Sequence, residues 1–88
     1  MKQLEKSVVN DLINFYSNYI NLGLCDEIKN QAKVIESKYL QSSTLISDDV
    51  FQLIGGLVDF YAPTNIKPLS INEAKKQLVF LKKRLEEL

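Results

Sequence analysis

The C-terminal segment places the strongest constraint on the fold, because its apolar residues recur at spacings of three and four. The residues that share this spacing are Ile71, Ala74, Leu78, Leu81, Leu85 and Leu88. Such spacing places all of them on one side of an α-helix. Ser70 precedes these residues, and Glu73 lies three residues after Ser70, which is the form of a capping box. The sequence therefore predicts a helix over residues 71–87 with one apolar face.

The segment before it is predicted to form the other arm of a helical hairpin, over residues 48–62. A serine and two acids at Ser47, Asp48 and Asp49 suit the positive end of a helix dipole. The inner face is predicted to consist of Val50, Ile54, Leu57 and Tyr61. Pro63 ends this arm, because the residue before a proline is pushed away from helical angles.

Two glycines, Gly55 and Gly56, fall inside this predicted helix. A glycine in a helix interior costs about 1 kcal/mol relative to alanine. Two explanations remain open. Another helix packs closely against one of the glycines, or the pair produces a kink that shapes a partner site.

Two further helices are predicted in the N-terminal half, over residues 3–22 and 26–41. The first has two adjacent apolar stripes, one of Leu4, Val8, Leu12, Phe15, Tyr19 and Leu22 and one of Val9, Ile13, Tyr16 and Ile20. We expect this helix to contact two others, because one neighbour rarely covers so wide an apolar surface. Gly23 is placed for a left-handed C-terminal cap, and Asp26 is expected to cap the next helix. The inner face of that helix is predicted to be Leu24, Ile28, Ala32, Ile35 and Tyr39.

Four amphipathic helices joined by short loops predict an all-α fold, an antiparallel up-down-up-down four-helix bundle. The 88 residues are expected to form a single domain. Hydrophobic residues make up 45% of the chain and charged residues 25%, which is ordinary for a globular domain.

Composition argues against several classes of function. The chain has no histidine, which removes the commonest general base and metal ligand, so we expect no enzyme activity, no cofactor and no metal site. Cys25 is expected to be an inert thiol in a cytoplasmic protein. Eleven basic residues balance eleven acidic ones, which argues against nucleic-acid binding through phosphate contacts. No apolar run approaches the length of a membrane span, so no transmembrane segment is predicted.

One surface signal remains, in the last predicted helix. On a helical projection three basic residues fall opposite the leucine stripe, Lys76, Lys83 and Arg84. Val79 and Phe80 fall on the same face, and we expect both to project outward. Such a charge run is usually a solvated face, but an exposed phenylalanine among basic residues often marks a contact. The candidate partner-binding residues are Lys67, Lys76, Val79, Phe80, Lys83 and Arg84.

The C-terminal hairpin resembles that of the immunity proteins of class IIa (pediocin-like) bacteriocins, especially the enterocin A-type group. The resemblance rests on chain length, on the order of four amphipathic helices and on residues 57–70. The matching residues are Leu57-Val58-Asp59-Phe60, then Thr64-Asn65 in the loop, then Ser70 and Glu73 at the cap.

The resemblance implies a non-enzymatic, cytosolic four-helix bundle in a Gram-positive bacterium. Such a protein acts at the inner face of the membrane, on the mannose phosphotransferase permease that the bacteriocin uses as its receptor. Members of this family block the open pore, and their C-terminal half decides which bacteriocins are neutralised. We expect a monomer or weak dimer. The alternative reading is a small helical adaptor or regulatory subunit of phage origin that pairs with another helical protein.

Overall fold

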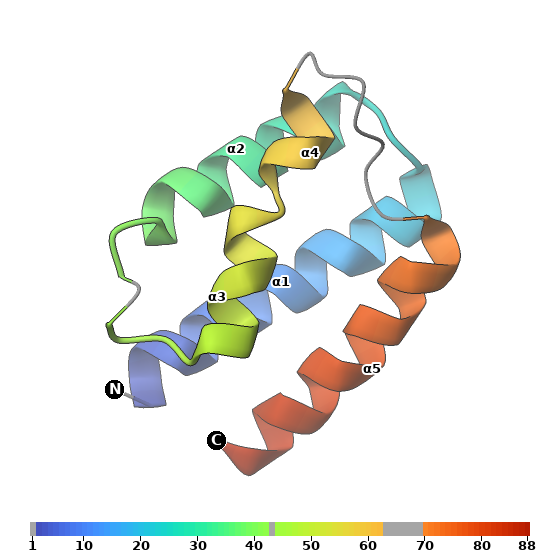
Figure 1. Cartoon of the computed structure of the whole chain (residues 1–88). Helices are drawn as coiled ribbons and strands as arrows, with labels where there is room; N and C mark the ends of the chain where they lie inside the picture. The colour runs from blue at the N-terminus through green and yellow to red at the C-terminus, as the bar shows by residue number, and fades with distance from the viewer. Residues whose placement is uncertain (1, 43, 63–69) are drawn as a thin grey trace.

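The computed structural model describes residues 2–42, 44–62 and 70–88. Within these ranges the chain forms helices and no strands, which confirms the all-α prediction and gives a helical bundle (Figure 1). The helices are α1 (Lys2–Leu22), α2 (Asp26–Tyr39), α3 (Asp48–Gly55), α4 (Val58–Tyr61) and α5 (Ile71–Glu87). None of the helices in these ranges is long and apolar enough to cross a membrane.

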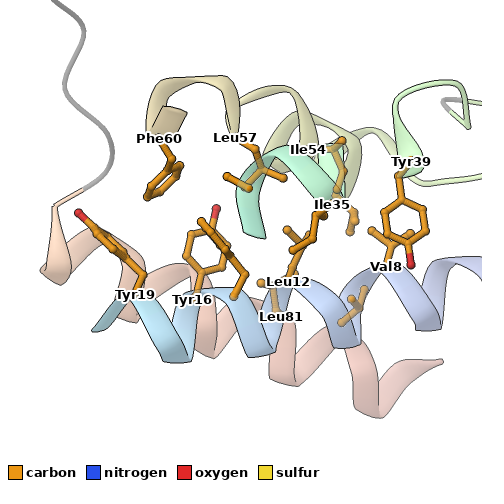
Figure 2. Close-up of a cluster of buried hydrophobic side chains, with 14 of the residues drawn as sticks. Val8, Leu12, Tyr16, Tyr19, Ile35, Tyr39, Ile54, Leu57, Phe60 and Leu81 are labelled. Carbon is orange, nitrogen blue, oxygen red and sulfur yellow. The ribbon is translucent and has the colours of Figure 1, made fainter. Parts of the chain in front are cut away.

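The first helix is the centre of the bundle. It packs against both α5 and α2, as its two apolar stripes predicted. Val8, Leu12 and Tyr16 are fully or almost fully buried and face side chains from α3, α4 and α5 (Figure 2). The predicted stripe is wrong at its end, because Leu22 is 54% exposed at the last position of α1. Leu24, predicted to be an inner residue of the next helix, is also exposed.

Aromatic contacts join α4 to α1. The ring of Phe60 lies edge-on to Phe15, with centroids 4.9 Å apart, and edge-on to Tyr19 at 5.1 Å. Each such pair contributes about 0.5–1.5 kcal/mol beyond the burial of its area. The short helix α4 is thus joined to α1 through Phe60, which is 3% exposed, and it also packs against α2, where the Tyr61 hydroxyl donates a hydrogen bond to the Glu36 carboxylate.

The helix ends agree with the sequence in two places. Gly23 has a φ of 72° and its N–H donates to the Tyr19 carbonyl at 2.8 Å, which confirms the left-handed cap. At the start of α5 the Ser70 hydroxyl accepts a hydrogen bond from the Glu73 N–H at 3.2 Å.

The predicted bounds of the second helix needed correction. The cap predicted at Asp26 is wrong, because Cys25 occupies the N-cap position and Asp26 is the first helical residue. The helix ends at Tyr39 rather than at residue 41. Cys25 itself is half-buried. The loop predicted between Pro63 and Leu69 lies outside the described residues.

The single helix predicted over residues 48–62 is wrong, because the chain breaks it into α3 and α4 at Gly55 and Gly56. Neither glycine has a positive φ, so the backbone does not require glycine. A Cβ at Gly55 would meet nothing within 4 Å, and one at Gly56 would meet only carbonyls of its own helix, the nearer at 3.5 Å. Close helix packing on a glycine is therefore excluded at both positions. Of the two explanations for the glycines, the break in the helix is the one that remains.

We predict that Gly55→Ala raises the free energy of unfolding by about 0.4–1 kcal/mol, because alanine restricts the unfolded chain and fits the native backbone. Urea unfolding followed by circular dichroism measures this change. Gly23→Ala is the control and should destabilise the fold, since its φ of 72° is strained for alanine. A destabilised Gly55→Ala variant would show that the break needs glycine.

Candidate partner-binding surface on the last helix

The outer face of α5 carries three of the predicted residues in the expected position. Lys76, Val79 and Lys83 are all exposed, and Val79 is the most exposed large apolar side chain of the described residues at 69%. Two lysines that the sequence reasoning left out of the site, Lys75 and Lys82, are exposed on the same face. Val79 therefore stands among four lysines, at three and four residues before and after it. That spacing was visible in the sequence and could have identified them.

Electrostatic pairing on this face is slight. Lys76 forms an exposed ion pair with Glu73 at 3.6 Å, which contributes little to stability. Within the described part of the chain, Lys75, Lys82 and Lys83 form no ion pair. The surface is therefore a basic face with an apolar centre, and its charges are available to an acidic partner.

Phe80 does not project outward, which corrects the predicted helical phase. Its side chain is half-buried and packs against the hydrophobic core. Phe80 lies about 100° around the helix from Leu81, on the side of α5 that faces Leu53 of α3. Its substitution would disturb the core, and Val79 is the better probe of the outer face.

Arg84 is also turned toward α3, and its side chain links α5 to both α3 and α1. Its guanidinium donates two hydrogen bonds to the Asp49 carboxylate and a third to the Ser47 Oγ at 2.9 Å. The same group lies 3.6 Å from the Glu5 carboxylate of α1. Only 22% of the Arg84 side chain and 15% of the Glu5 side chain are exposed. Arg84 is thus a structural residue in this fold.

The hydrogen bonds from Arg84 lower the pKa of one partner, Asp49. Hydrogen bonds from Arg84 hold the pKa of Asp49 below its ordinary value, against the opposing effect of burial. Ser47 donates both its hydroxyl and its N–H to Glu5, the latter at 3.2 Å. We call Glu5, Ser47, Asp49 and Arg84 the arginine clasp.

The remaining predicted site residue, Lys67, lies outside the described residues. In the residues that are described, no group of three histidine, cysteine, aspartate or glutamate side chains could hold a metal ion. Comparison with known proteins gave no match: no family model, no curated protein and no solved structure matches the chain.

Proposed function

We propose that this protein is an immunity protein against a pediocin-like bacteriocin. It acts by binding, without catalysis, at the cytosolic side of the mannose phosphotransferase permease. The proposal joins the family resemblance of the C-terminal hairpin to the basic face of α5. The observation that carries it is Val79, 69% exposed at the centre of four lysines on the last helix of the C-terminal half, the half to which the resemblance assigns recognition.

The physical basis is that charged and apolar residues have different roles at protein interfaces. Lysines around a contact steer an acidic partner and set the association rate, while the apolar centre loses water on contact. The opposite face of α5 packs on α1 and contains the fully buried Leu81. The helix therefore presents its lysines from a rigid support.

The proposal keeps the expected antiparallel up-down-up-down order of the helices. Supporting it, α1 and α5 pack side by side and the two chain ends lie near each other at one end of the bundle (Figure 1). In this arrangement the whole outer face of α5 is open to a partner at the inner surface of the membrane.

The test is survival of bacteria that carry the permease and are sensitive to pediocin-like peptides. Cells that express this protein should survive at least one peptide of a panel at concentrations that kill cells with an empty vector. Equal killing by every peptide, with the protein shown to be folded in the cells, would contradict the proposal. That result would favour the helical adaptor instead.

A further inference from the structure

A hollow of about 450 Å³ opens between α5 and the break that separates α3 from α4. This volume lies within the range typical of small-molecule sites, about 300–1,000 Å³. Leu53, Phe60 and Phe80 form apolar walls, and the carboxylates of Asp49 and Asp59 lie among the polar lining. The hollow is separate from the basic outer face of α5, because Phe80 lines it while Val79 does not.

Tyr16 of α1 also lines the hollow, and its hydroxyl has no hydrogen-bond partner in the described residues. The residue is 1% exposed, and Figure 2 shows the hydroxyl directed away from α1, toward Leu57 and Phe60. No fully buried side-chain nitrogen or oxygen of the described residues lacks a partner, so the Tyr16 oxygen is reached from the hollow. Burial raises the pKa of Tyr16, so its hydroxyl stays protonated and able to donate.

The charges that line the hollow have one sign. The Asp49 carboxylate forms an ion pair with Arg84. The Asp59 side chain, in contrast, has no hydrogen bond or ion pair with the residues that the structure describes. No lysine or arginine of those residues lines the space. A carboxylate without a basic neighbour favours a cationic ligand and disfavours an anion.

The break between α3 and α4 lies at the edge of the same hollow. The two glycines are required neither by positive φ nor by close packing, yet each lowers helix propensity. Gly56 lines the hollow. The break therefore borders the space that an uninterrupted helix would reshape.

We propose that this hollow binds a small aromatic amine. The aromatic ring lies against Phe60 and Phe80, a polar group at its inner end bonds to the Tyr16 hydroxyl, and its ammonium pairs with Asp59. Aromatic walls favour a ring by edge and face contacts, and also favour a cation. This site is independent of the proposed function, because neither the permease nor a bacteriocin takes part.

The probe is tyramine, added to the purified ¹⁵N-labelled protein and followed by NMR. Tyramine should shift the amide signals of residues that line the hollow, with a Kd on the order of 1 mM for so small a ligand. Tyr16→Phe should weaken binding by about five-fold through loss of one hydrogen bond. The substitution removes only an unpaired oxygen, so the variant should melt at or above the parent temperature. Asp59→Asn should also weaken binding.

Two analogues are the matched controls. Phenethylamine lacks the hydroxyl, so it should bind the parent more weakly than tyramine and should be insensitive to Tyr16→Phe. The acid 3-(4-hydroxyphenyl)propionate reverses the charge and should not bind. Absence of shifts with tyramine at about 10 mM, ten times the expected Kd, would overturn the proposal. Equal binding of all three compounds, or equal tyramine binding by the parent and Tyr16→Phe, would overturn it too. None of these outcomes bears on the survival test, which uses a different surface.

Discussion

Replacing Leu81 with alanine should lower the free energy of unfolding by about 2–5 kcal/mol, the range for buried leucines. Leu81 is fully buried on α5 and faces the core formed by α1 (Figure 2). Its removal deletes apolar contacts and leaves a cavity between the two helices. Since a small domain has a stability of only about 5–15 kcal/mol, this one change should lower the urea midpoint clearly.

Leu78→Ala is the matched control, on the same helix and with the same change of side chain. The sequence predicted that Leu78 would be buried, but it is only half-buried, so its replacement should cost less. Equal losses in the two variants, measured by urea unfolding, would show that the α1–α5 contact differs from the one described.

Replacing Arg84 with glutamine should destabilise the protein by about 1–3 kcal/mol, less than a fully buried pair because the site is partly solvated. The change removes the hydrogen bonds to Asp49 and Ser47 and leaves the largely buried Glu5 without its cationic neighbour. Lys83→Gln is the control, since Lys83 is exposed, and it should change stability by less than about 0.5 kcal/mol. Similar stabilities for the two variants would contradict the arginine clasp.

The clasp also predicts how stability depends on pH. The pKa of Asp49 in the folded protein is below its ordinary value of 3.8. The stabilisation by Asp49 is therefore complete above 3.8 and is lost as the pH falls through the lower pKa of the folded state. Melting temperatures across acidic pH should fall less steeply in Arg84→Gln than in the parent. Identical slopes would contradict this role of Asp49.

The sequence predicted a helix most accurately where all the signals for that helix lie within its own residues. The apolar spacing of residues 71–88 and the Ser70 cap correctly placed α5, because both signals are local to the helix. The bounds of α1 were equally accessible, and Gly23 marked its end. The break at Gly55 and Gly56 was harder to predict, because each glycine costs a helix only about 1 kcal/mol and tertiary packing often overrides such a cost.

The candidate surface was predicted only in part, because exposure at the edge of a helix depends on the neighbouring helix. Helical projection placed Lys76, Val79 and Lys83 correctly on the outer face. It could not place Phe80, which packs against the core, or Arg84, which pairs with Asp49 and Glu5 from distant parts of the chain. The hollow above Tyr16 was not predicted either, since it forms where three segments meet.

The most direct test of the account removes the basic face of α5 and measures protection against the peptide that the parent resists. The test variant combines Val79→Ser with Lys82→Gln and Lys83→Gln. The matched control combines Val34→Ser, at a valine 65% exposed on α2, with Lys6→Gln and Lys29→Gln at exposed lysines. Both lose the same charge and the same kind of apolar group, and neither touches the core. Each substitution should change the free energy of unfolding by less than about 0.5 kcal/mol.

The account predicts that cells with the α5 variant are killed like cells with an empty vector, while cells with the control survive like the parent. Survival of the α5 variant at the parent level would contradict the central claim that this face of α5 binds the partner.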